Sequence, residues 1–244
     1  MGTKSVTAEQ PAFYARPGSI RGDLIALLHP PYTAWHLAYV AIGAALAPTL
    51  DWTRLAGTLA AFFLGTGVGA HALDEWHGRP LRTTLSNQVL LALGLGGLAG
   101  AAVLAVVGGF VISAWVLAWA VCGGLLVAGY SLELHQALHS DLGFAFAWGA
   151  FPIIVGYWAQ AETIDPGVLP LATAVLLISL AQRSLSKHAR FVRRSVTSVS
   201  VEFEVGGQSK PWSRRQLLTS WELPLQLLSA SIVMLALALV VLRS

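Results

Sequence analysis

The chain has 244 residues, of which 55% are hydrophobic and only 11% are charged, and its mean hydropathy is +0.66. A soluble globular domain carries about 25% charged residues, so this composition excludes an ordinary soluble domain. Cys122 is the single cysteine and lies in an apolar run, which excludes a disulfide framework and a cysteine metal site.

The polar residues 1–20 lack the apolar core of a signal peptide, so we expect a cytoplasmic tail followed by one transmembrane domain over residues 21–244. Residues 19–29 favour a short interfacial helix. Charge-free runs long enough to cross a bilayer follow at 24–50 (its span beginning after Pro30-Pro31), 55–73, 83–132, 142–161, 166–182 and 223–242. The run 83–132 is long enough for a helical hairpin that turns near Gly108-Gly109. The sequence therefore predicts an all-α integral membrane protein with a bundle of about seven transmembrane helices.

The basic residues predict the orientation. With a cytoplasmic N-terminus, the inner segments hold thirteen Lys and Arg residues and the outer side holds only Arg54 and Arg243. The net charge of +3 is therefore explained by membrane topology and not by nucleic-acid binding. We expect an integral protein of a prokaryotic plasma membrane. The glycines of the third span, Gly94, Gly96, Gly97 and Gly100, favour close helix packing.

A small insertion is expected in the predicted cytoplasmic loop 184–222. Residues 199–205 alternate apolar and polar side chains and precede Gly206-Gly207, which indicates a strand. A lone strand is marginal, so it pairs either within the loop or with a second copy of the chain in a homodimer. Residues 211–222 resemble an amphipathic interfacial helix anchored by Trp212 and Trp221.

The first polar cluster closes the second predicted span. On a helix His71 shares a face with Asp74 or Glu75, and His77 follows before Gly78 and Pro80 end the helix. A polar helix end that merely meets water is the simpler alternative. His29 is expected at the surface, and His36 is expected to pack or hydrogen-bond inside the first span.

Two further clusters follow the fourth and sixth spans. His135 and His139 are four residues apart, which lets two imidazoles of one helix reach the same metal, and Glu133 points to a neighbouring helix. A solvated loop is the alternative for this segment. The third cluster, residues 182–190, contributes His188. Its cations, which include Lys187 and Arg190, suit an anionic head group or anionic membrane lipids.

The three clusters lie at the cytoplasmic ends of spans two, four and six, and these ends can converge in a bundle. Imidazole combined with carboxylate suits iron, zinc or manganese, whereas magnesium prefers oxygen ligands and phosphate. The sequence therefore predicts a metal site at this end, with ligands His71, Glu75, His135, His139 and His188.

The order of spans over residues 20–195 resembles the UbiA-type intramembrane prenyltransferases, of which the chain looks like a divergent member. The similar features are the acidic motif with Asp74 and Glu75 after the second span, Arg79-Pro80-Leu81 after it, Tyr130-Ser131, and Pro152 with Gly156. This resemblance implies a UbiA-like helical bundle with a lipophilic cavity, and repeated aspartates that bind magnesium and a prenyl diphosphate. At the second motif, residues 184–194, this chain has His188 and no aspartate.

Three functions follow from these features. The preferred one is a membrane metalloenzyme with one or two iron ions that oxidises or desaturates a lipid or isoprenoid-like substrate with the help of an electron donor. Asp74, Glu75, His77 and Glu133 would be catalytic or support the ligands.

The second function is a transferase or lyase acting on a prenyl diphosphate. Asp74 and Glu75 would hold magnesium, and Arg79, Lys187 and Arg190 would hold phosphate. The third is a non-enzymatic metal-binding or transport protein.

Overall fold

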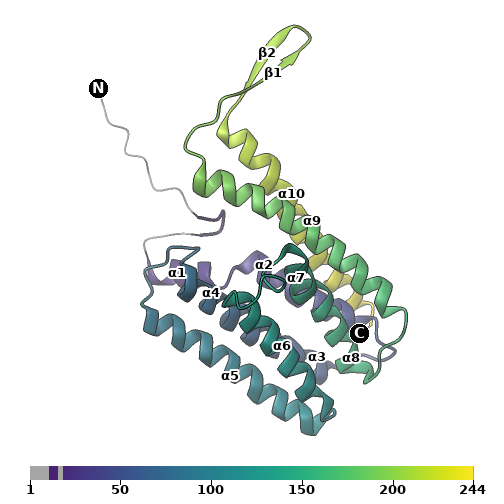
Figure 1. The fold of residues 1–244 in the computed structure, drawn as a ribbon. Helices are drawn as coiled ribbons and strands as arrows, with labels where there is room; N and C mark the ends of the chain where they lie inside the picture. Colours follow the sequence, from purple (N-terminus) through teal and green to yellow (C-terminus); the bar gives the residue numbers. More distant parts are fainter. Residues whose placement is uncertain (1–10, 16–18, 244) are drawn as a thin grey trace.

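The computed structural model describes residues 11–15 and 19–243. Helices make up most of this part of the chain, and five of them are long and apolar enough to cross a membrane (Figure 1). These are the continuous segment α3–η1–α4, α5, the continuous segment α7–η2–α8, α9 and α10. The elements in chain order are α1 (Ile20–Leu27), α2 (Pro30–Ala45), α3 (Trp52–Phe62), η1 (Phe63–Ala70), α4 (His71–Gly78), α5 (Asn87–Val111), α6 (Trp115–Ser131), α7 (Asp141–Ala145), η2 (Phe146–Ala150), α8 (Phe151–Ala161), α9 (Val168–Ser195), β1 (Val201–Val205), β2 (Gln208–Trp212) and α10 (Arg214–Val241).

The helices fall in the predicted apolar runs, and α1 confirms the short helix expected at residues 19–29. Their starts follow from local capping: the Asp51 carboxylate accepts the N–H groups of Thr53 and Arg54 before α3, at 2.8 and 2.9 Å. Two of the seven predicted spans, α2 and α6, have only 16 and 17 residues.

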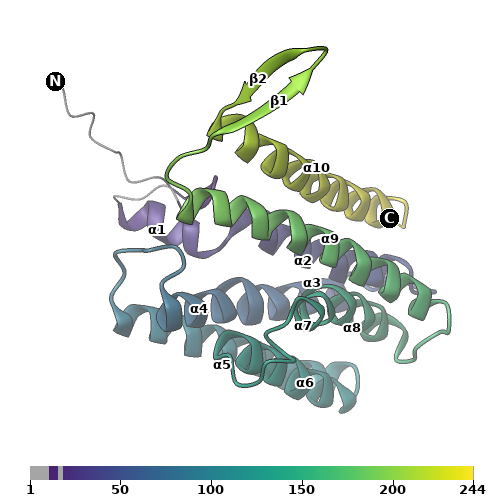
Figure 2. The same ribbon diagram turned by 45° about the horizontal axis from the view of Figure 1, so that its top comes forward.

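The α2 helix lies at the centre of the bundle, where it packs against α8 on one side and α10 on another. Its side chains Trp35, Tyr39 and Ile42 are buried together with Ile153 of α8 and Ile232 of α10. Figure 2 shows α5 and α6 on the side of the bundle opposite α10. The core is thus built around α2, although α2 is the shortest of the seven predicted spans.

Two of the helices that are long and apolar enough to cross a membrane contain π-helical segments next to the predicted polar clusters. The η1 segment leads directly into His71, and η2 contains Trp148. Such segments widen a helix locally and are frequent at functional sites.

Three predicted boundaries are wrong. The helical hairpin turns at residues 112–114, between the end of α5 and the start of α6. Gly108 and Gly109 still belong to α5, where they allow α5 to pack closely against Val116 and Leu117 of α6. The predicted cytoplasmic loop 184–222 begins inside α9, which continues to Ser195. Residues 214–222 do not form a separate interfacial helix, because α10 starts at a Ser213 capping box and runs through Pro224.

The predicted strand is present, and it pairs within the loop. β1 and β2 form an antiparallel hairpin in which Val205 pairs with Gln208 across Gly206-Gly207. Both glycines have positive φ, +59° and +74°, as the two-residue turn of a hairpin requires. Trp212 belongs to β2, where its ring meets Phe203 edge-on at 5.1 Å, and does not anchor an interfacial helix.

Candidate functional site

Polar side chains converge at the end of the bundle where α2 begins and α4 and α6 end. They come from residues that are far apart in sequence, and α9 covers them with a row of arginines. We call this group the polar cluster: Tyr14, His29, Tyr32, His71, Asp74, Tyr130, Ser131, Arg183, Ser186, Arg190 and Arg194.

One corner of the polar cluster joins the N-terminal segment to the bundle. The Tyr14 hydroxyl and Nδ1 of His29 form a hydrogen bond of 2.7 Å, and the His29 ring stacks on His71 with 4.3 Å between centroids. Burial, followed by the nearby His71, lowers the pKa of His29 well below 6.5, so this imidazole is neutral near pH 7. The expected surface position of His29 is therefore wrong, because Tyr14 and Tyr32 enclose its ring.

His71 and Asp74 occupy the first turn of α4. The Nδ1 atom of His71 lies 3.2 Å from the Gly67 carbonyl oxygen, one turn earlier in η1. The Asp74 carboxyl lies beside Ser131 at the end of α6 and interacts electrostatically with His139 and Arg183. The π-helical segment before His71 thus aims both side chains at the α2 and α6 ends.

Three arginines of α9 are spaced by seven and four residues, which puts Arg183, Arg190 and Arg194 on one face of the helix. Arg183 is 16% exposed, bonds through Nε to the Asp141 carboxylate at 3.2 Å, and lies 4.8 Å above the Phe144 ring. Arg194 donates from Nε to the Pro11 carbonyl oxygen at 3.3 Å. Both end arginines of the row therefore have protein acceptors.

Arg190, between them, differs in its partners. Its guanidinium donates to the Ser186 hydroxyl, and its other electrostatic neighbours are the phenols of Tyr32 and Tyr130 and the two flanking arginines. Within the described part of the chain no carboxylate lies at ion-pair distance from Arg190. The centre of the cluster is thus a partly buried cation without an anionic partner.

An apolar cavity of about 520 Å³ lies between α3, η1, α5, α6 and α8. Its size is within the roughly 300–1,000 Å³ of ligand pockets. Val127, Ala147 and Trp148 line it. The Trp148 ring contacts the ring of Tyr130 in the polar cluster, with 5.6 Å between centroids. The Trp148 carbonyl oxygen lies 2.7 Å from Nδ1 of the buried His36, which forms a hydrogen bond as expected. The cavity and the polar cluster therefore share a wall.

Glu75 has a structural position. Its side chain is fully buried, and its carboxylate accepts the N–H groups of Leu81 and Thr83, both at 2.8 Å, and the Thr83 hydroxyl at 3.0 Å. Arg79 has φ +49° after α4 and donates to the carbonyl oxygens of Thr83 and Leu85. Both side chains brace the 79–85 loop, and the Glu75 carboxylate also interacts electrostatically with Arg194 of the polar cluster.

The second predicted cluster does not form the expected helix. Because α6 ends at Ser131 and Glu133 has φ +52°, His135 and His139 lie in a turn and do not share a helical face. His135 is exposed and bonds the Ala137 N–H, whereas the His139 Nε2 atom lies 3.4 Å from Glu133. Glu133 thus lies beside a histidine of its own turn, and its carboxylate also interacts electrostatically with Asp74 of the neighbouring helix α4.

The remaining predicted site residues lie at the edge of the polar cluster or outside it. His188 is exposed and stacks on Trp221 of α10, 4.6 Å between centroids, which turns it away from α4. Lys187 is 3.5 Å from Asp141, and His77 is exposed at the end of α4. Within residues 11–15 and 19–243, no three His, Cys, Asp or Glu side chains form a group that could hold a metal ion.

Of the predicted residues, the structure places His71, Asp74 and Arg190 in the polar cluster. Sequence reasoning missed Tyr14, in the predicted tail, and Tyr32, at the start of the first predicted span, for which the only signal was an aromatic side chain. Arg183 lay within the third predicted cluster but was not singled out as a site residue. Comparisons of the chain with protein-family models, with curated proteins and with solved structures found no match. The resemblance to UbiA-type prenyltransferases thus stays a prediction from the sequence.

Proposed function

We propose that this chain is an intramembrane transferase or lyase acting on an isoprenoid-like lipid with a phosphate or diphosphate head group. The observation that carries the proposal is Arg190, a partly buried guanidinium with no carboxylate partner in the described structure. An uncompensated charge inside a protein costs several kcal/mol, so a site that keeps one is suited to an anionic ligand. Guanidinium is also the group that binds phosphate oxygens in pairs.

The position of the cavity supports an amphiphilic ligand. An anionic head group at Arg190 lies beside Tyr130, and the Tyr130 ring touches the Trp148 wall of the cavity. The cavity lining is almost entirely apolar and includes Trp119, Phe151 and Trp158. An isoprenoid chain in the cavity would therefore place its first carbon near the polar cluster.

The arrangement suits cleavage of the bond between the chain and its head group. When the carbon–oxygen bond breaks, the electron pair leaves with the phosphate oxygen, and Arg190 with the Tyr32 and Tyr130 hydroxyls stabilises the added negative charge. The carbon centre left behind is cationic, and it either binds a nucleophile, as in a transferase, or loses a proton, as in a lyase.

Magnesium is compatible with this site when a ligand contributes oxygen atoms. Asp74 supplies a carboxylate to the polar cluster, and magnesium in phosphate sites is held by one or two carboxylates and the phosphate itself. Bound there, magnesium would neutralise charge on the leaving group. The predicted iron centre has less support, because its five ligands lie apart: Glu75 is engaged by the 79–85 loop and His188 by Trp221.

The test is binding of radiolabelled farnesyl diphosphate and farnesyl phosphate to the full chain in lipid nanodiscs, with and without magnesium. We expect Arg190→Gln to weaken binding roughly 10- to 100-fold, the equivalent of about 1.5–3 kcal/mol for a hydrogen bond to a charged group. Arg215→Gln, exposed at the start of α10, is the matched control and should keep the affinity of the unmodified chain. Asp74→Asn should reduce only the magnesium-dependent part, and His188→Ala should change nothing.

Release of inorganic phosphate or diphosphate from the bound lipid separates an enzyme from a binding protein. Equal affinity of the Arg190→Gln variant, or no saturable binding of either lipid, would overturn the proposal. Competition by free diphosphate without competition by farnesol would show that the head group, and not the chain, dominates affinity.

A further inference from the structure

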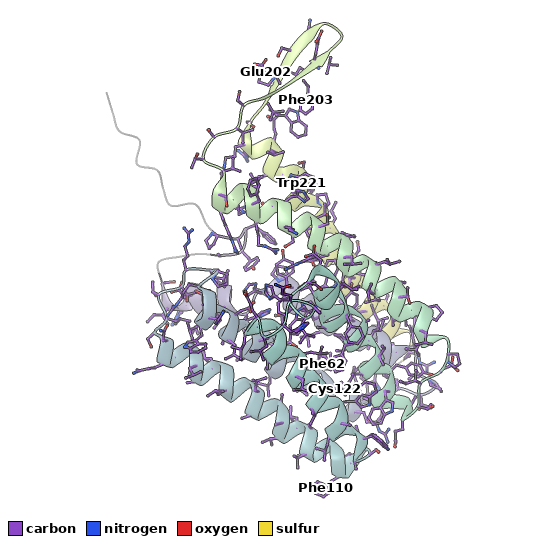
Figure 3. The ribbon with its side chains drawn as sticks, in the orientation of Figure 1. Phe62, Phe110, Cys122, Glu202, Phe203 and Trp221 are labelled. Carbon is purple, nitrogen blue, oxygen red and sulfur yellow. The ribbon has the colours of Figure 1, made fainter. Side chains whose placement is uncertain are left out.

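The β1–β2 hairpin stands clear of the bundle. Figures 1 and 2 show it beyond the joined ends of α9 and α10, and Figure 3 shows Glu202 and Phe203 on it, remote from the other helices. Every residue from Val201 to Pro211 is exposed. A two-stranded hairpin is marginal by itself in water. The hairpin therefore presents its strand edges to a partner outside the bundle.

The hairpin is held on a braced pair of helices. Arg193 and Glu222 form a bidentate ion pair, with 2.6 Å between Nη2 and Oε2. Both side chains are at most 15% exposed. His188 stacks on Trp221 in the same region, and Arg214 donates to the carbonyl oxygens of Val192 and Val196. From Arg183 to its end α9 extends about 20 Å at 1.5 Å per residue. This charged section carries the hairpin beyond the apolar part of the helix.

The two edges of the hairpin differ. In an antiparallel pair, residues alternate between exchanging hydrogen bonds and pointing their backbone groups outward. Because Val205 and Gln208 close a two-residue turn, the outward residues are Glu202 and Glu204 on β1 and Ser209 and Pro211 on β2. Pro211 has no N–H, which blocks the β2 edge. Among the described residues, no other strand pairs with the β1 edge.

The side chains of β1 define the complementary partner. Val201, Phe203 and Val205 lie on one face and are 37%, 44% and 53% exposed, while Glu202 and Glu204 lie on the other. Two copies pairing antiparallel through β1 around Phe203 would set Glu202 directly opposite Glu204, and like charges opposite one another are destabilising. Charge complementarity therefore argues against a second copy and for a cationic strand.

We propose that the β1 edge docks a soluble protein by strand addition, and that the docked strand alternates Lys or Arg with apolar residues. Its cations would lie opposite Glu202 and Glu204, and its apolar side chains would extend the Val201–Phe203–Val205 face. Main-chain hydrogen bonds supply affinity in this mode, and the alternating side chains supply specificity. The positive-inside bias puts this surface in the cytoplasm.

The test uses the full chain in nanodiscs and three dye-labelled peptides read by fluorescence anisotropy. The peptides are an alternating Lys-Val strand, the same residues in blocks, and an alternating Glu-Val strand. We expect saturable binding of the alternating Lys-Val peptide, at least tenfold tighter than that of the other two. The double variant Glu202→Lys/Glu204→Lys should reverse the preference toward the Glu-Val peptide.

A second variant separates the strand edge from simple charge attraction. Glu204→Pro removes an outward N–H without removing a bond of the hairpin, and Glu204→Gln removes only the charge. Strand addition predicts a larger loss of affinity for the proline variant. Equal binding of alternating and block peptides, equal loss in both variants, or dimerisation of the unmodified chain abolished by Glu204→Pro would each overturn the proposal.

Discussion

Two neighbouring glycines of α5 offer a sharp test of how the bundle positions the polar cluster. A Cβ atom at Gly97 would lie 2.6 Å from the Leu64 carbonyl oxygen and 2.7 Å from the Gly69 nitrogen, both backbone atoms of η1. A Cβ atom at Gly96 would meet nothing within 4 Å. Since the same substitution on the same helix meets opposite surroundings, Gly97→Ala and Gly96→Ala form a matched pair.

The magnitude follows from these distances. An ordinary carbon–oxygen or carbon–nitrogen contact needs more than 3 Å, so α5 and η1 must separate by several tenths of an ångström when Gly97 becomes alanine. Overpacking of this kind costs about 1–3 kcal/mol. At Gly96, alanine is a better helix former than glycine by about 1 kcal/mol and should be neutral or stabilising. The expected changes in unfolding free energy therefore have opposite signs.

The assay is thermal unfolding in detergent, followed by tryptophan fluorescence, for the unmodified chain and both variants. For a chain of this size we expect Gly97→Ala to lower Tm by roughly 2–12 °C. Gly97→Ala should also weaken lipid-phosphate binding, because η1 leads directly into His71 and Asp74. Equal Tm values for the two variants would refute the close approach of α5 and η1.

Three further predictions address the site. Glu75→Gln should destabilise the chain by about 2–3 kcal/mol in chemical unfolding, because the amide cannot accept all the bonds of the 79–85 loop; an unchanged midpoint would show that the loop does not depend on it. The pKa of His29 is depressed in the folded chain, so the attachment of residues 11–15 through Tyr14 is complete above pH 6.5 and weakens as pH falls below it. After correction for intrinsic rates, hydrogen exchange of residues 11–15 should therefore be faster at pH 5 than at pH 8. A His77→Ala control should behave in the same way as the unmodified chain. Equal corrected rates at pH 8 and pH 5 would contradict this prediction. Metal analysis of chelator-free protein should find no stoichiometric iron, and one or two iron ions per chain would restore the oxidative hypothesis.

The helices were predictable because their signals are local. The apolar runs have the length of a membrane span, and residues such as Asp51 and Ser213 cap the helices that follow them. The glycines of α5 serve close packing as expected at Gly94, Gly97 and Gly100, whereas Gly96 faces open space. Periodicity cannot separate these cases, since the side on which a neighbour packs is a tertiary property.

The turn that carries His135 and His139 shows where local reasoning fails. Two histidines four residues apart share a face only if the segment is helical, and this one is not, because Glu133 takes a left-handed conformation after α6. The prediction of Glu75 as a metal ligand shows a different limit of local reasoning. Its helical face was predicted correctly, but its carboxylate is used by backbone N–H groups eight residues and fewer downstream. A ligand pattern in sequence does not exclude such a competing partner.

Arg190 shows why the site itself was only partly predictable. The sequence presents five basic residues between 183 and 194, and nothing in their spacing distinguishes one from another as a ligand. In the folded chain Arg183 is paired with Asp141, whereas Arg194 donates to the Pro11 carbonyl oxygen and interacts electrostatically with the Glu75 carboxylate. Arg190 differs from these two arginines because Tyr32 and Tyr130 bring hydroxyl groups to its guanidinium, and neither brings a carboxylate that would neutralise its charge. An unpaired cation is a property of the assembled cluster, and so the function it supports emerges only when α2, α6 and α9 are brought together.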